Sequence, residues 1–498
     1  MKKLFALFFI SALLFNLSSS HFVGNAIWPI KSLSAIHSFL PTLILSLCFV
    51  YFLLKVDLKN KVSLFTFLFI SAFFVHYRHD VFFYFDEWTL LNVFQDSSIL
   101  TYHHNEHYLP LFFSFLKLET KIFGMHYQLY LLVSILLHTL NTFLVYDLSL
   151  DIFEKQVHRK LLAKIIAVLF MLSSLHSEAL HWAFEQSLLI CATLILVSVR
   201  FARRYFHNGD KVALVTSLTA ACLSPFVFGN GFSVPIILLL FWLLDYPDLQ
   251  FARLRNLLSP IILWFGVCAL FYFSNSPQPA AEIDNQIART LAYIFSGSQL
   301  GVVLRGLGLY PTLELDAAPK LLATFPFSKV REFPEVSIAC LGFFISLASL
   351  LLTFRYKHAL SKIWLIGFLL PIATIILPAL TRWHYGSAQA LSLRYSYLGV
   401  FGLFLMLSPC ILMLIENSKS RLFLGLILTS NIYLQLCLSK DFRYFSNYGI
   451  RHRDYVEKLI AWKCTGSRMP RHLATISPGF NQDLIYKAVT WLDQNPCD

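Results

Sequence analysis

Residues 397–415 read YLGVFGLFLMLSPCILMLI, an apolar run that contains no charged side chain. Such a run is long enough to cross the hydrocarbon core of a bilayer, which takes about 20 residues of helix. Over all 498 residues, 57% are hydrophobic and only 14% are charged, and the mean hydropathy is +0.63. This composition excludes a soluble enzyme, a secreted disulfide scaffold and a disordered chain. The sequence therefore predicts an all-α polytopic membrane protein.

Similar apolar runs recur along most of the chain. The first follows Lys2 and Lys3 and is also compatible with a cleaved signal peptide, because Ser18, Ser19 and Ser20 form a small-residue region. Cleavage there would leave the later spans unchanged. We expect about thirteen membrane-spanning helices, at residues 4–19, 36–54, 62–77, 127–147, 161–175, 182–199, 212–227, 232–244, 257–274, 336–354, 363–380, 397–415 and 422–438.

The positions of the basic residues predict the orientation of these spans. The formal net charge of +12 suggests a nucleic-acid partner at first sight, but no soluble segment carries a basic patch with interleaved aromatic residues. The positive-inside rule explains the charge better, since alternate connections hold the lysines and arginines. We therefore expect the N-terminus inside, the C-terminus outside, the lipid bilayer as a partner and no nucleic acid. The residues of these connections include Lys55, Lys59, Lys61, Lys155, Arg159, Lys160, Lys164, Arg200, Arg203, Arg204, Lys211, Arg253, Arg255, Arg355, Lys357, Lys362, Lys419 and Arg421.

The long polar segments all fall on the outer side of this topology, so we expect any chemistry there. Residues 1–438 would form the transmembrane module, with external loops at about 78–126, 275–335 and 381–396, and residues 439–498 would form a small external C-terminal segment. The short cytoplasmic connections hold no Gly-rich phosphate loop, which argues against an ATP-driven pump.

The nine cysteines divide into two groups. Seven lie in or beside apolar spans, where a thiol packs as a small hydrophobic group. Cys464 and Cys497 fall in the C-terminal segment, where an oxidising exterior allows a disulfide to persist. The sequence leaves both the bridged and the free form of this pair open.

The first external loop carries two adjacent acids, Asp86 and Glu87, in the segment FYFDEW (83–88). A carboxylate beside apolar aromatic walls has a raised pKa, and it can take a proton from an acceptor hydroxyl during group transfer. The alternative is structural, with Asp86 capping the following helix and Glu87 in its first turn.

The same loop continues with the segment YHHNEHYLP (102–110), which contains His104, Glu106 and His107. These side chains could hold a divalent metal ion, but the adjacent His103 and His104 lack the i, i+4 spacing of a helical zinc motif. Contacts with phosphate or sugar are therefore the favoured interpretation. A divalent metal ion stays open as a cofactor.

Three short motifs give the sequence a family resemblance: NEHYLPL (105–111), LHSEALHW (175–182) and LRYSYL (393–398). They resemble motifs of GT-C class bacterial membrane glycosyltransferases, similar to family-39-like enzymes and to the transmembrane O-mannosyltransferases that carry tetratricopeptide repeats. The resemblance covers roughly residues 80–400. It implies a GT-C-like fold, a polyprenyl-phosphate-linked sugar donor and an active site on the non-cytoplasmic face.

The resemblance also implies roles for single residues. Asp86 matches the catalytic base, and Glu87 stands where relatives often have a second acid that orients the acceptor, assists the base or helps to bind a metal. Arg394 matches a ligand of the donor phosphate, since a guanidinium group pairs with phosphate oxygens; its alternative role is an interfacial anchor with neighbouring tyrosines. The further donor- or substrate-binding candidates are Tyr397, His104, Glu106, His107, His176, Glu178 and Arg382.

Other polar residues near these motifs have a structural interpretation. His176 and Glu178 occupy a short turn, where they could also form a polar bridge between helices. His138 and Asn141 are one helical turn apart on the span 127–147, so they are better explained as an interhelical hydrogen-bonding pair than as catalysts.

The implied reaction is a single displacement that inverts the anomeric carbon and needs no nucleotide or redox cofactor. The chain departs from the family pattern in Glu185-Gln186, where relatives commonly have Gly-Arg, and in the absence of tetratricopeptide repeats after the last span. The acceptor is thus an unknown glycan, lipid or protein. The bacterial character of the resemblance favours the inner membrane, with the site facing the periplasm. A polysaccharide polymerase or ligase for polyprenyl-linked glycans, a transporter and a non-catalytic scaffold remain alternatives.

Overall fold

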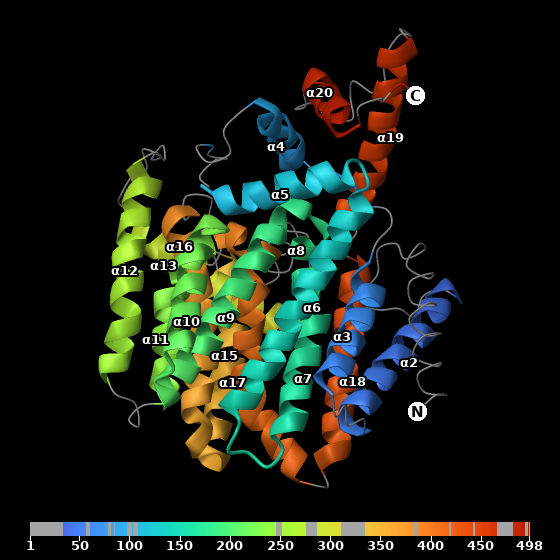
Figure 1. Cartoon of the computed structure of the whole chain (residues 1–498). Helices are drawn as coiled ribbons and strands as arrows, with labels where there is room; N and C mark the ends of the chain where they lie inside the picture. The colour runs from blue at the N-terminus through green and yellow to red at the C-terminus, as the bar shows by residue number, and fades with distance from the viewer. Residues whose placement is uncertain are drawn as a thin grey trace.

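The regular elements of the described chain are all helices (Figure 1). This finding confirms the predicted all-α class. The first predicted span, residues 4–19, lies outside the described residues. The computed structural model describes residues 33–55, 60–77, 81–83, 85–96, 102, 108–245, 251–274, 286–309, 334–382, 387–417, 420–441, 444–465, 482–493 and 497.

Twelve long helices coincide with the remaining predicted spans and form one bundle (Figure 1). Eight described segments are long and apolar enough to cross a membrane, or nine if the bent pair Arg159–Leu172 and Ser174–His181 is one span. A multi-pass membrane protein is therefore confirmed, while the total of about thirteen spans and their orientation stay predictions. The helices are α2 (Leu33–Lys55), α3 (Lys61–His76), α6 (Tyr127–Ile152), α7 (Arg159–Leu172), α9 (Gln186–Asn208), α10 (Lys211–Leu223), α11 (Val234–Asp245), α12 (Phe251–Ser274), α15 (Pro334–Tyr356), α16 (Ser361–Arg382), α17 (Tyr397–Glu416) and α18 (Arg421–Asp441).

Two glycines allow the close packing of α16 against α17. A Cβ atom on Gly367 would lie 2.2 Å from the backbone nitrogen of Met406, and one on Gly402 would lie 2.6 Å from Cδ of Pro371. Small residues commonly let helices approach in membranes, where dispersion contacts replace the hydrophobic effect as the driving force. This contact fixes the end of α16 and the start of α17, which both carry candidate site residues.

A helical segment that the sequence did not predict fills part of the bundle. Sequence analysis places residues 275–335 in an external loop, but α13 (Gln286–Phe295) and the π-helical η8 (Ser296–Leu304) form there, and Gln286–Leu304 is one of the eight candidate spans. All residues of η8 are buried. Its Gly, Ser and Gln residues dilute the apolar signal, which explains why hydropathy alone missed it.

The two ends of the bundle differ in character. Helices α4 (Phe85–Asp96) and α5 (Pro110–Phe123) lie over one end, here called the capped end, which is uppermost in Figure 1. The opposite end, here called the basic end, holds the predicted cytoplasmic lysines and arginines that the structure describes. There, Arg253 on α12 donates hydrogen bonds to the carbonyl oxygens of Phe206 and His207 at the end of α9.

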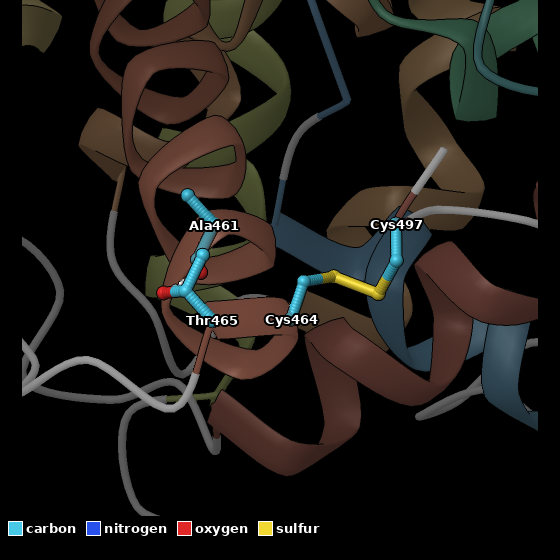
Figure 2. Close-up of a disulfide and its surroundings, with 4 residues drawn as sticks. All are labelled: Ala461, Cys464, Thr465 and Cys497. Carbon is cyan, nitrogen blue, oxygen red and sulfur yellow. Dashed lines mark hydrogen bonds between the residues drawn. A yellow bond between two sulfur atoms is a disulfide. The ribbon is translucent and has the colours of Figure 1, made fainter.

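The C-terminal segment covers the capped end as well. Helix α19 (Tyr444–Thr465) continues beyond α18, and α20 (Gln482–Leu492) packs on α4, where Gln95 Nε2 donates to the Lys487 carbonyl oxygen over 3.3 Å. Cys464 and Cys497 form a disulfide (Figure 2), which decides between the two forms that the sequence left open. The tail is thus a folded part of the cap.

Side chains of α19 also bind the first loop. The ring of His452 stacks on Trp88 of α4, with 6.4 Å between the ring centroids, and burial lowers the pKa of His452 to about 4. Arg453 donates to the Val81 carbonyl oxygen over 3.2 Å and lies over the ring of Phe82. The first external loop and the tail are therefore held together at the same end of the bundle.

Candidate functional site

Three short segments at the capped end bring together an arginine and two glutamates. The segments are α8 (Ser177–His181), η4 (Ala183–Glu185) and η13 (Leu393–Ser396). Arg394 Nη1 lies 3.2 Å from Oε1 of Glu185 and 3.8 Å from Oε1 of Glu178. One guanidinium nitrogen therefore faces both carboxylates, and the predicted residues Arg394 and Glu178 do lie together.

Glu178 fixes the turn that precedes Arg394. Its carboxylate accepts from the hydroxyl of Ser392 at 3.1 and 3.2 Å and from the backbone N–H of Arg394 at 3.2 Å. Short helical segments leave backbone N–H groups without helical partners, and a carboxylate is a strong acceptor for them. Glu178 thus holds both the backbone and the side chain of the site arginine.

Aromatic rings surround the Arg394 guanidinium. Its central carbon lies 5.8 Å from the ring centroid of Trp182 and 5.4 Å from that of Tyr395, distances at which the ring faces attract a cation. The candidate Arg382, at the end of α16, donates from Nη1 to the Tyr395 hydroxyl over 2.6 Å. Tyr395 therefore joins the two candidate arginines, although sequence analysis gave it only an anchoring role.

Glu87 links the cap to the bundle. Its buried Oε1 accepts from the Tyr127 hydroxyl and from the Phe184 backbone N–H, both at 3.2 Å. The preceding residue, the predicted base Asp86, lies in the first turn of α4, and its side chain lies outside the described residues. Glu87 satisfies two buried donors, so its position agrees with a supporting role beside Asp86 better than with direct contact with an acceptor.

A second buried acid, Glu119, comes from α5. Phe112, Phe113, Leu116 and Glu119 share the i, i+3, i+4 spacing of one helix face, and all four are buried. Burial raises the pKa of Glu119 to about 8, the nearby amide of Gln186 opposes the shift, and the negative charge of Glu87 adds to it. Sequence analysis missed Glu119, although its place on the apolar face of an amphipathic helix was a signal.

Tyr397 and His176 belong to a different group, within the bundle. His138 Nδ1 and the Tyr397 hydroxyl are 2.7 Å apart, and Asn141 Nδ2 donates to the same hydroxyl over 3.2 Å. The ring of His176 packs on Tyr397, with centroids 4.4 Å apart. His138 and Asn141 thus bind across helices as expected. Tyr397 and His176, two predicted donor-binding residues, contact this buried group, and neither forms a hydrogen bond with Arg394 within the part of the chain that the structure describes.

Three predicted site residues, His104, Glu106 and His107, lie outside the described residues. Within the described part, no group of three or more His, Cys, Asp or Glu side chains is placed to hold a metal ion. The divalent metal therefore stays a prediction that concerns the His-rich segment.

The partner of Arg394 that sequence reasoning missed is Glu185. This residue was noted only as a departure from the family pattern, because a single acid in a short turn has no periodicity that reveals its partner. Comparison of the chain with protein-family models, with curated proteins and with solved structures finds no match in any of the three. The geometry of the capped end is thus the basis for any functional interpretation.

Proposed function

We propose that the chain is a GT-C-type membrane glycosyltransferase. It would transfer a sugar from a polyprenyl-phosphate donor to a glycan, lipid or protein acceptor on the non-cytoplasmic face of a bacterial inner membrane. The short motifs at residues 105–111, 175–182 and 393–398 suggest this class. The structural support is that the residues of two of these motifs meet at one end of the bundle.

One observation carries the proposal: η4 connects the predicted phosphate site to the helix of the predicted base. The Phe184 N–H binds Glu87, next to Asp86, and the adjacent Glu185 binds Arg394. A general base and a cation for the leaving phosphate must both lie near one reacting carbon. Two neighbouring residues of η4 provide that connection.

In the proposed reaction, the acceptor hydroxyl attacks the anomeric carbon and Asp86 removes its proton. The bond between the anomeric carbon and the phosphate oxygen breaks as the new glycosidic bond forms, so the configuration inverts. Arg394 would stabilise the negative charge on the departing phosphate, because a fixed cation acts where charge develops. Arg382, on the other side of Tyr395, would add a second positive charge.

Transfer from radiolabelled polyprenyl-phosphate sugars tests this function. Membranes that contain the wild type should consume one donor, and Asp86→Asn should lower the rate by at least about 100-fold, the usual contribution of a general base. Asp454→Asn is the matched control, since Asp454 is an exposed carboxylate on α19 that pairs with Lys458. Equal consumption by wild type and Asp86→Asn, or no consumption of any donor, would contradict the proposal.

We infer that the capped end faces away from the cytoplasm. The described members of the predicted positive-inside residues lie at the other end, and the capped end carries the Cys464–Cys497 disulfide, a bond that persists in oxidising compartments. A membrane-impermeant maleimide should therefore label this pair in intact cells, but only after treatment with an impermeant reductant. Labelling that requires lysis of the cells would indicate the opposite orientation. The double variant Cys464→Ser/Cys497→Ser is the control.

A further inference from the structure

The Arg394 pair is incomplete on both sides. Arg394 uses Nη1 to contact Glu185, and its Nε has no hydrogen-bond partner in the part of the chain that the structure describes. On the other side, Oε2 of Glu185 is buried and also lacks a described partner. Buried polar atoms are normally satisfied, so an unpaired donor and an unpaired acceptor in one pair point to a ligand.

This group has no spare positive charge. The guanidinium groups of Arg394 and Arg382 offset the carboxylates of Glu178 and Glu185, and the side chain of Glu185 is only 1% exposed. An anion that binds to Arg394 would therefore leave an excess negative charge in a buried place. An uncompensated buried charge is costly, and a carboxylate in such a position tends to take a proton.

No other described neighbour supplies the missing positive charge. Helix α4 contributes the acid Glu87, which accepts from the N–H of Phe184, next to Glu185. Helix α6 contributes the phenol of Tyr127, which accepts from the N–H of Ala183. The titratable and charged groups that face Glu185 and Arg394 from the surrounding elements are Glu178 from α8, Arg382 from α16, Tyr395 from η13, Glu87 from α4 and Tyr127 from α6.

We propose that Glu185 takes up one proton from water when a phosphodiester anion binds to Arg394. The anion accepts from Nε of Arg394, and the new hydroxyl of Glu185 donates to an oxygen of the ligand or remains beside Glu178. No covalent bond changes other than the O–H bond formed at Glu185. The choice of a phosphodiester rests on the proposed function, whereas the proton uptake follows from the charge balance of the site.

Coupling between proton uptake and anion binding makes the affinity for the anion depend on pH. If binding takes up one proton, the dissociation constant rises tenfold for each pH unit above the pH at which Glu185 loses its proton in the free protein. The Glu185→Gln variant has a neutral side chain of the same shape at this position. Its affinity for the anion should therefore not change with pH and should equal or exceed that of the wild type at high pH.

Isothermal titration calorimetry of the full-length protein in nanodiscs tests the proposal. Farnesyl methyl phosphate is the probe, because its single negative charge does not titrate over the range used, and dimethyl phosphate is the probe without a lipid tail. Titrations in two buffers of different ionisation enthalpy give the number of protons taken up. We expect close to one for the wild type and for the control Asp454→Asn, close to zero for Glu185→Gln, and no binding to Arg394→Gln.

Each outcome has a defined meaning. Binding of both probes with proton uptake identifies a site for the phosphodiester group itself, and binding of the farnesyl ester alone identifies a lipid phosphate site. Binding without uptake, unchanged uptake in Glu185→Gln, or no binding of either probe overturns the inference. If Glu185→Gln does not fold, a wild-type affinity that is constant with pH overturns it equally. Proton-coupled binding without sugar transfer would refute the proposed function alone.

Discussion

The ionic groups at the two ends of the bundle have opposite arrangements of acids and bases. At the basic end, Asp147 lies 3.0 Å from Nζ of Lys61 and 2.9 Å from Nη2 of Arg200, so one acid stands between two bases. At the capped end, Arg394 stands between two acids, Glu178 and Glu185. The arrangement of charges is thus reversed between the two ends.

Exposure differs as much as charge. Lys61 and Arg200 are 63% and 35% exposed, so water can hydrate them if their acid is removed. Arg394 and Glu185 are 19% and 1% exposed, so each depends on the other for compensation. The basic end therefore has a group suited to orientation in the membrane, where exposed cations suffice. The capped end has a group that holds charge away from water, which is typical of functional sites in membrane proteins.

The largest loss of stability is expected from Arg394→Gln, because this variant removes the cation of the more buried of the two ionic groups. The variant removes the cation that contacts both Glu178 and Glu185, and loss of one partner of a buried ion pair costs about 3 to 5 kcal/mol. Equilibrium unfolding in mixed SDS micelles measures the change. The double variant Arg394→Gln/Glu185→Gln should recover most of the loss. A double variant as unstable as the single one would show that uncompensated charge is not the cause.

An intermediate effect is expected from Glu119→Gln, because no cation in the part of the capped end that the structure describes offsets this second acid. The pKa of Glu119 rises from an ordinary value of 4.5 to about 8, so the folded protein holds a proton that the unfolded chain has released. The free energy of unfolding should therefore fall as pH rises from about 4.5 to 8.

In Glu119→Gln this pH dependence should be smaller, and the variant should be more stable than the wild type above pH 8. A change in pKa from 4.5 to about 8, at ~1.4 kcal/mol per pKa unit, gives an upper bound of about 5 kcal/mol. Water that hydrates the ionised carboxylate in the folded protein lowers the expected difference to about 2 kcal/mol. Unfolding at a series of pH values measures it. Glu154→Gln, at an exposed acid of the basic end, should leave the wild-type curve unchanged. An identical curve for Glu119→Gln would mean that Glu119 is ionised in the folded protein.

The smallest effect is expected from Asp147→Asn. Asp147 itself is only 3% exposed, but the two cations that lose their acid are exposed enough to be hydrated, and the ion pairs of exposed lysines and arginines contribute about 0 to 1 kcal/mol. The same unfolding experiment measures the loss, and phosphodiester binding should stay at the wild-type level. A loss as large as that of Arg394→Gln would remove the distinction between the two ends.

Hydropathy predicted the bundle well but could not predict all of its packing. Twelve apolar runs coincide with helices because length and composition decide membrane insertion. The segment Gln286–Leu304 escaped because Gly297, Ser298 and Gln299 interrupt its apolar pattern. Its burial depends on neighbouring helices, which a single window of sequence does not contain.

The site was predictable only in part for a similar reason. Short motifs predicted one shared site for Glu178 and Arg394, and the two residues are in contact in the structure. They could not separate Tyr397, which lies only three residues after Arg394 and yet binds His138, because the change from η13 to α17 turns the two side chains to different neighbours. Glu185 was missed as a partner since ion pairing across 209 residues leaves no local pattern.

The contact of α20 with α4 has a consequence for the synthesis of the chain. Gln95 and Lys487 are 392 residues apart, so at about 5–20 residues per second a ribosome needs roughly 20–80 s to make the second after the first. Helix α4, which carries the predicted base in its first turn, is not covered by α20 during this interval. The enclosure of the capped end is therefore among the last events in the maturation of the protein.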